Sequence, residues 1–281
     1  MKRRSRTVSA LAVAVLLQLV ASTAIAGDPA VGDGSPQMAA IYGTDGTWVP
    51  LSADQLAALD KKKQVVEAAA AMTVRTPAPN GINATCRNGI CGTILPTWYR
   101  HQAKSYYCGP AAVQVISNHA WSMPSGGNKY TQQYISDHWT HTDADGQTYV
   151  WRVRYGLNGS TAGKYPWPFA EEYVSNPAVW HDHVVVDATD FGMPSVAGVA
   201  PHDPNFGYYL TSWPTAITAG HYIVTRGWLY LWDDTRTPIV YYNDGSAGYG
   251  GSDGQFSDPA YDIWKTIKKS NPNHSEGWIV W

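Results

Sequence analysis

Hydrophobic positions follow a helical period in the first half of the chain. Ser52 to Ala71 predicts a helix, because Ser52 and Gln55 have the spacing of a capping box and apolar residues recur on one side. Gly109 to Trp121 predicts a second helix. A proline is tolerated in its first turn, because the N–H that proline lacks would have no partner in the helix. Further helices are expected at Thr131 to Trp139 and around Phe169 to Val174.

The pattern changes in the second half of the chain, where short β-rich runs are bounded by turn residues. Helices followed by antiparallel strands predict an α+β domain. The expected strands are Val184–Asp187, Ser195–Val199, Gly220–Trp232, Pro238–Asn243 and Trp278–Trp281.

The first residues have the three parts of a secretory signal peptide. A basic start (Lys2, Arg3, Arg4, Arg6) precedes an apolar run, and Ala24-Ile25-Ala26 supplies the small-x-small cleavage pattern. The apolar run is too short to span a membrane, and no later segment approaches the ~20 apolar residues that a span requires. We therefore expect a secreted protein, cleaved after Ala26, with no membrane span.

Residues 27–84 are expected to form a leader that contains the helix at 52–71. Thr76 to Gly81 is a Pro/Gly linker that separates this helix from the rest of the chain. The segment is either an inhibitory pro-segment or a helix that docks on the domain or spaces it. We expect the catalytic domain to cover residues 85–281.

Charge excludes two classes of partner. The chain has 20 basic and 22 acidic residues, and the predicted cleavage removes four basic residues and no acidic one. A mildly acidic mature protein lacks the electrostatic footprint of a protein that binds nucleic acid or an anionic membrane surface. The 18 tyrosines and 13 tryptophans suit peptide or glycan binding, although aromatic residues also stabilise cores.

Three cysteines in an exported chain leave one without a partner. Cys86 and Cys91 flank a short loop with an Asn-Gly turn, and we expect a local disulfide between them. Cys108 is then either an intermolecular link or a reactive thiol. It lies where the second helix begins, and the positive end of a helix dipole favours the nucleophilic thiolate.

A reactive thiol requires a histidine and a group that orients the imidazole. Among nine histidines, His221 alone opens a predicted strand, which would hold the ring rigidly at the end of a sheet. The next strand ends in Asn243-Asp244 and would pair with the first as a hairpin. Either Asp244 or Asn243 can therefore orient His221. Gln102, six residues before Cys108, can donate a hydrogen bond to an oxyanion.

These residues also carry a family resemblance. Gln102, Tyr107-Cys108-Gly109-Pro110-Ala111-Ala112, Gly220-His221-Tyr222-Ile223-Val224 and Tyr241-Tyr242-Asn243-Asp244 occur in the order of the papain-like superfamily. Within it, the chain resembles the bacteriocin-processing double-glycine peptidases (cysteine peptidase family thirty-nine) in a stand-alone secreted form. The resemblance covers about residues 94–281.

The resemblance implies a papain-like fold and a role for each matching residue. Cys108 would be the nucleophile, His221 the general base and then acid, Asp244 the orienting carboxylate and Gln102 the oxyanion donor. The implied substrate is a peptide or protein, and no cofactor is implied. The family often has an acidic residue before the cysteine and a proline after the acid, where this chain has Tyr107 and Gly245. No transporter-like segment is present, so cleavage of double-glycine leaders is not carried over.

Other functions remain open at this level. The same thiol chemistry supports transamidation if an amine replaces water. A papain-like frame without turnover could bind peptides, glycans or cell wall, and a surface protein could be linked through Cys108. The metal interpretations are weak, because His138-x-x-His141 and His181-Asp182-His183 lack a third ligand and the Asp143 to Gly146 turn lacks the glutamate of a calcium loop. We expect no metal or cofactor, and the oligomeric state is not determined.

Overall fold

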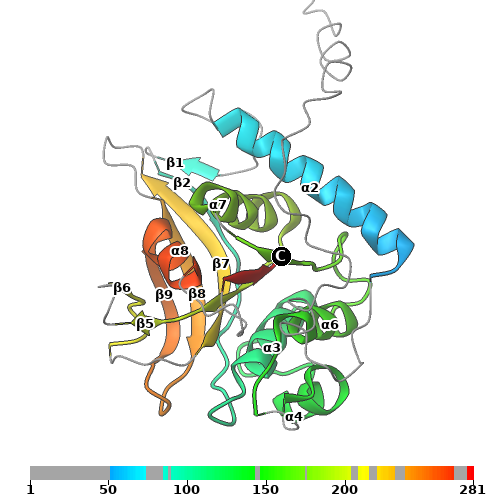
Figure 1. Cartoon of the computed structure of the whole chain (residues 1–281), viewed down its shortest axis with the longest axis vertical. Helices are drawn as coiled ribbons and strands as arrows, with labels where there is room; N and C mark the ends of the chain where they lie inside the picture. The colour runs from blue at the N-terminus through cyan, green and yellow to red at the C-terminus, as the bar shows by residue number, and fades with distance from the viewer. Residues whose placement is uncertain are drawn as a thin grey trace, which may run out of the picture. The chain divides into compact units, whose positions relative to one another are not determined.

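A sheet of eight antiparallel strands forms the centre of the computed structural model (Figure 1). Its strand order is β1-β2-β7-β4-β10-β3, and β8 pairs with β7 and with β9. This arrangement confirms the predicted mixture of helices and an antiparallel sheet. The strands are β1 (Thr85–Arg87), β2 (Ile90–Ile94), β3 (Glu171–Tyr173), β4 (Ser195–Val199), β7 (His221–Leu231), β8 (Ile239–Gly245), β9 (Asp253–Pro259) and β10 (Trp278–Val280), with a separate pair β5 (His202–Asp203) and β6 (Tyr208–Tyr209).

The structure describes residues 51–73, 85–87, 90–142, 146–174, 176–203, 208–214, 220–231, 238–268 and 277–281. The predicted signal peptide, its cleavage site after Ala26 and the Pro/Gly linker lie outside these residues. The helices are α2 (Ala53–Thr73), α3 (Cys108–Ala120), α4 (Gln132–Ile135), α6 (Val150–Ser160), α7 (Pro177–Val186) and α8 (Ala260–Lys268), with π-helical turns η2 (Ser136–Thr140) and η3 (Asp187–Phe191). Within the described part of the chain, no helix has both the length and the apolarity to cross a membrane.

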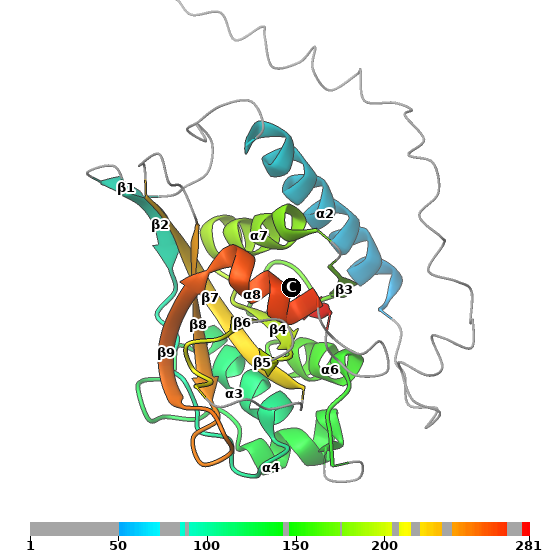
Figure 2. The ribbon, with the colours of Figure 1, turned by 60° about the vertical axis from the view of Figure 1, so that its left-hand side comes forward.

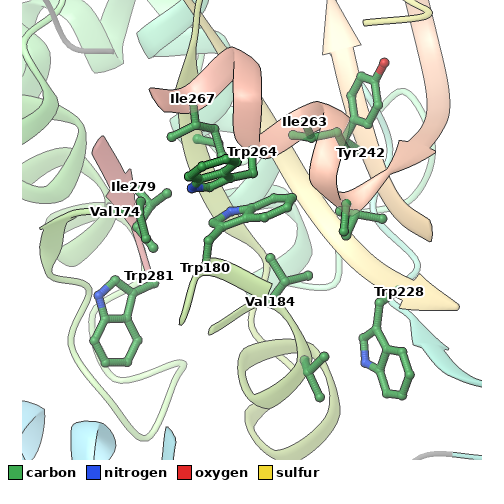
Figure 3. Close-up of a cluster of buried hydrophobic side chains, with 14 of the residues drawn as sticks. Val174, Trp180, Val184, Trp228, Tyr242, Ile263, Trp264, Ile267, Ile279 and Trp281 are labelled. Atoms are coloured by element: carbon green, nitrogen blue, oxygen red, sulfur yellow. The ribbon is translucent and has the colours of Figure 1, made fainter. Parts of the chain in front are cut away.

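Helices cover both faces of the sheet, and the alternation of side chains along the strands explains why. On β7, Ile223 belongs to the core shared with α7 and α8, whereas its neighbours Tyr222 and Val224 belong to the core shared with α3 and α6. Figure 2 shows the two helical layers on opposite sides of the strands. Figure 3 shows the first of these cores, where Trp180 of α7 lies beside Trp264 of α8.

Two predicted elements are wrong. Val184–Asp187, predicted as a strand, lies at the end of α7 and the start of η3. The β-branched valines are outweighed by a strong helix start upstream, where the Asn176 side chain accepts a hydrogen bond from Ala178 N at 2.8 Å and Pro177 opens the helix. The helix expected around Phe169–Val174 is instead β3, because this segment pairs with the C-terminal strand β10.

Helix α2 covers the range predicted for the leader helix and packs on α7, as both views in Figures 1 and 2 show. Ser52 and Gln55 form the reciprocal capping box, with Ser52 N donating to Gln55 Oε1 at 2.9 Å and Gln55 N donating to Ser52 Oγ at 3.2 Å. Leu59 and Val66 are buried in the core that α7 and α8 share with the sheet. The helix is therefore docked on the domain.

Candidate active site

His221 and Asp244 meet at the end of the β7–β8 hairpin. His221 is the first residue of β7, and Asp244 is the penultimate residue of β8. The Nε2 atom of His221 lies 2.9 Å from Oδ1 of Asp244, and both side chains are buried. Because Nε2 is engaged with the carboxylate, Nδ1 is the ring nitrogen left to face a nucleophile.

Cys108 is the first residue of α3, and its half-buried side chain is a thiol that is not part of a disulfide. The thiol lines the same hollow as the His221 ring and is close enough to help raise the pKa of that histidine. The side chain of Tyr107, the N-cap residue, accepts no hydrogen bond from the first N–H groups of the helix. The sequence-predicted cysteine, histidine and aspartate thus lie in the order nucleophile, base and orienting carboxylate.

The pleat of β8 separates the two residues that competed to orient His221. Asp244 shares a face with Tyr242, whose ring lies in the core beneath α7 and α8, and Asn243 points to the other face. The side chain of Asn243 is buried and donates from Nδ2 to Thr97 Oγ1 at 2.6 Å. Asn243 therefore holds the segment before Arg100, while Asp244 contacts the histidine.

Gln102 lies beside the thiol. Its backbone N donates to Gly245 O at 2.8 Å, and its side-chain Nε2 donates to Ser105 O at 3.1 Å. The side chain is almost completely buried and lines the same hollow as Cys108 and His221. An amide nitrogen carries two hydrogens, so Nε2 retains one for an oxyanion.

The local charges favour a protonated imidazole. Burial alone would lower the pKa of His221, but Asp244 and Cys108 outweigh burial and raise it to about 10. Burial likewise acts to raise the pKa of Asp244, yet His221 and nearby hydroxyl groups leave it below its ordinary value. At neutral pH the site therefore holds an imidazolium beside a carboxylate.

Trp213 completes the surroundings of Asp244, and the sequence analysis missed it. Its Nε1 donates to Asp244 Oδ2 at 2.9 Å, and its ring packs edge-on against His221 with centroids 5.1 Å apart. The indole is 3% exposed, so it also keeps water from the His221–Asp244 pair. Trp213 precedes the histidine in a loop without periodic pattern, and nothing in the sequence signals its role.

The loop that carries Trp213 is fixed from β9. Asp258 accepts hydrogen bonds from Thr211 N at 3.0 Å and from Thr211 Oγ1 at 2.5 Å. Tyr242 also donates to Asp258, at 2.6 Å, and lies 3.3 Å from Ser212 Oγ. A buried carboxylate therefore anchors the loop two residues before the indole that contacts Asp244.

Two glycines permit close approaches at the site. A Cβ on Gly109 would lie 2.4 Å from Thr148 Oγ1, so the residue after Cys108 must be small for α3 to pack on that threonine. A Cβ on Gly245 would lie 1.8 Å from Arg100 O, where the chain that leads to Gln102 crosses β8. The absence of a side chain at Gly245 thus permits this crossing.

A small hollow opens at the thiol, and the side chain of Arg100 is fixed in its wall. Arg100 donates to Asn128 Oδ1 at 2.7 Å, Gly127 O at 2.6 Å and Tyr99 O at 2.8 Å. Tyr107 is fully buried and packs beneath the site. The hollow is lined by Arg100, Gln102, Cys108, Ala111, Ala112, Val115, His221, Tyr222, Val224, Asn243, Asp244 and Gly245.

The histidine pairs considered as metal ligands have other surroundings. His138 Nδ1 donates to Tyr134 O at 2.9 Å, and His183 lies against the ring of Trp281. Among the residues that the structure describes, no group of three or more histidine, cysteine, aspartate or glutamate side chains could hold a metal ion.

Cys86 and Cys91 are register partners across the β1–β2 hairpin. Opposite residues of an antiparallel pair lie about 4.5–5.5 Å apart at Cα, within the range of about 4.4–6.8 Å that a disulfide spans. The backbone therefore suits the expected bond, although the side chain of Cys86 lies outside the described residues and the disulfide stays a prediction.

Comparison with solved structures finds 16 similar chains, and two of them are structures of bromelain or its precursor. Bromelain from Ananas comosus, in complex with the inhibitor E64, is 12% identical with a TM-score of 0.40, over 65% of this chain and 92% of that chain. A recombinant stem bromelain precursor is also 12% identical with a TM-score of 0.34, over 65% of this chain and 66% of that chain. With TM-scores below 0.5, these likenesses do not assign a function. No protein-family model and no curated protein matches the chain.

Proposed function

We propose that this protein is a thiol peptidase or related amide hydrolase with a papain-like arrangement, in which Cys108, His221 and Asp244 act together. The observation that carries the proposal is the buried His221, which lines the same hollow as Cys108 and lies 2.9 Å from the Asp244 carboxylate. A nucleophile, a base and an orienting group in this order are the parts of covalent acyl-transfer catalysis.

In the proposed reaction, the Cys108 thiolate attacks the carbonyl carbon of a peptide bond. The imidazolium of His221 and the first turn of α3 both favour the thiolate. The tetrahedral oxyanion accepts hydrogen bonds from the Cys108 backbone N–H and from Gln102 Nε2. Loss of one such donor typically lowers turnover by about 10²–10³.

His221 then donates its proton to the leaving amine, and an acyl-enzyme remains on Cys108. The neutral imidazole takes a proton from an incoming water, which attacks the thioester and releases the acid and the thiolate. An amine in place of that water would give transamidation by the same steps. Analysis of the products in the presence of an added primary amine separates the two outcomes.

Alkylation tests the site without knowledge of the substrate. We expect iodoacetamide near pH 7 to modify Cys108 rapidly, and His221→Ala to slow the modification about tenfold or more, because the thiolate loses its cationic partner. His138→Ala, which removes an exposed histidine elsewhere, is the matched control and should react like the wild type. Slow alkylation of the wild-type thiol would favour a binding protein over an enzyme.

Turnover tests the nucleophile. Cys108→Ala should lower hydrolysis of a peptide library by about 10⁴-fold or more, with an unchanged circular dichroism spectrum, because no other group can form the acyl-enzyme. Full turnover by this variant would refute the assignment.

We further propose that the enzyme is exported, on the strength of the basic start, the apolar run and the Ala24-Ile25-Ala26 pattern. N-terminal sequencing of protein recovered from the culture medium should begin at Gly27. A chain that starts at Met1 in the cell fraction would contradict export.

A further inference from the structure

Helix α2 places the side chain of a lysine inside the core of the domain. Its inward face carries Leu59, Lys62 and Val66, spaced by one helical turn each. Lys62 is 0% exposed, whereas its neighbours Lys61 and Lys63 are exposed. A lysine is almost never fully buried without a specific partner, so this position requires an explanation.

The partner of Lys62 is a carboxyl group at the end of α7. Nζ of Lys62 lies 3.0 Å from Oδ1 of Asp187, and the two side chains are 0% and 1% exposed. In the described part of the chain, neither carboxylate oxygen of Asp187 has a hydrogen-bond partner of good geometry. The amine and the carboxyl group therefore face each other with water excluded.

Aromatic rings enclose the pair. Nζ of Lys62 lies 4.4 Å from the ring centre of Trp281, 5.8 Å from that of Phe191 and 5.9 Å from that of Phe169. Trp281, which Figure 3 shows at the edge of the core, follows strand β10 directly. The rings exclude water, which disfavours the charged forms of the pair. Their faces also attract an ammonium group, so it is burial and not ring contact that favours the neutral amine.

The titration of both groups follows from this burial. Burial lowers the pKa of Lys62 despite the attraction of Asp187 and Glu172, and burial raises the pKa of Asp187 despite Lys62 and His183. The pair is thus shifted toward an uncharged amine, which is a nucleophile, and a carboxylic acid, which is an electrophile.

Glu172 on β3 is a second acidic group near the pair. Its charge acts on Lys62, and its carboxylate accepts a hydrogen bond from Trp281 Nε1 at 3.1 Å. His183 lies 3.6 Å from its other oxygen, and these partners together hold the pKa of Glu172 below its ordinary value against the effect of burial. Glu172 therefore stays a carboxylate.

We propose that Lys62 and Asp187 condense into an intramolecular amide bond that fastens α2 to the end of α7. Nζ of Lys62 attacks Cγ of Asp187, and a C–N bond forms while the carbon becomes tetrahedral. One proton moves from the nitrogen to the hydroxyl group of the former acid. That hydroxyl leaves as water, so the products are one amide and one water molecule, and no oxidant or cofactor is consumed.

The dry, aromatic surroundings favour this bond in two ways. They shift the reacting groups toward their uncharged forms and hold them in contact, which replaces an encounter in solution by a fixed geometry. They also exclude the water that would hydrolyse the amide. An amide bond at this place would keep α2 on the domain after any cut in the linker at residues 74–84, so α2 could not leave as a pro-segment.

Mass spectrometry tests the bond directly. The protein is prepared as Cys108→Ala, so that the result does not depend on the proposed peptidase activity, and is reduced and alkylated. We expect its intact mass to be lower than that of the linear sequence by one water molecule. Proteolytic digestion should yield a branched peptide that joins Lys62 to Asp187, with no cleavage by trypsin after Lys62.

Matched variants assign the loss of water to this pair. Lys62→Met, which keeps an unbranched side chain in the aromatic box, should have the full mass of its linear sequence. Lys61→Met, which changes an exposed lysine one residue away, should retain the loss. A wild-type chain of full mass would overturn the proposal. A loss of water that maps to another residue, such as a succinimide at an Asp-Gly step, would also overturn it.

Discussion

At the scale of single residues, the candidate site depends on which atoms touch a buried carboxylate. Asp244 accepts from His221 Nε2 and from Trp213 Nε1, both at 2.9 Å. Two donors on different oxygens fix the orientation of the carboxylate, and the carboxylate in turn orients the histidine ring. Trp213 is therefore a positioning residue in the proposed reaction, since it acts on His221 through Asp244 and through ring contact.

We expect Trp213→Phe to lower kcat about tenfold with little change in KM. The variant keeps an aromatic ring but loses a hydrogen bond to a charged group, worth about 1.5–3 kcal/mol, and about 1.4 kcal/mol corresponds to a factor of ten. Trp228→Phe is the control. Trp228 lies on β7, the strand that begins with His221, and the substitution removes its indole hydrogen bond to Thr189 Oγ1. Equal losses in both variants would mean that the effect is structural.

The pH dependence follows from the raised pKa of His221. The imidazolium form of His221 is present below that pKa, and activity should fall as pH rises through about 10. Asp244→Asn removes the negative charge that raises the pKa, so the alkaline limb of kcat/KM should move to lower pH. Asp253→Asn, at the carboxylate that pairs with His101, is the control and should leave the limb in place.

The same shift has a consequence for stability. His221 has its ordinary pKa of 6.5 when unfolded and a raised one when folded, so its ion pair stabilises the fold fully below pH 6.5 and is lost as pH rises through about 10. Asp244→Asn should therefore weaken the decline of the melting temperature over this range. An unchanged alkaline limb and an unchanged decline would contradict the assigned partner.

At the scale of elements, segments with a clear hydrophobic period were predictable from the sequence. Segments whose secondary structure depends on pairing or packing with another element were not. The apolar face of α3 and the capping box of α2 are local features, and both helices lie where the pattern predicts them. β3 has no strand pattern and exists because β10 offers it hydrogen bonds. α7 ends in three valines, and its helix start and packing override their preference for strands.

Helix α2 carries its own prediction, because one face of it belongs to the core. Leu59→Ala should lower the free energy of unfolding by about 2–3 kcal/mol, since it leaves a cavity between α2 and the domain. Leu56→Ala, on the same helix at 49% exposure, should change it by less than about 0.5 kcal/mol. Denaturant unfolding of both variants measures the difference. Equal stability would mean that α2 is not part of the cooperative unit.

At the scale of the whole molecule, the site is assembled from three segments that are distant in sequence. The start of α3 brings Cys108, the hairpin of β7 and β8 brings His221 and Asp244, and the loop anchored by Asp258 brings Trp213. The sheet holds the first two together, because α3 packs across β7. The buried pair Lys62–Asp187 joins the leader helix to this assembly at a different place.

The sequence by itself determined the mixed helix and sheet architecture, the leftover thiol at a helix start and the histidine at a strand start, because these depend on short-range periodicity and on residue chemistry. It favoured Asp244 through the family resemblance but left Asn243 as a rival, and it contained no sign of Trp213 or of the partner of Lys62. Only the tertiary structure decided these points. The pleat and register of β8 choose the residue that faces His221, and the packing of loops and helices against the sheet chooses which polar groups are buried together.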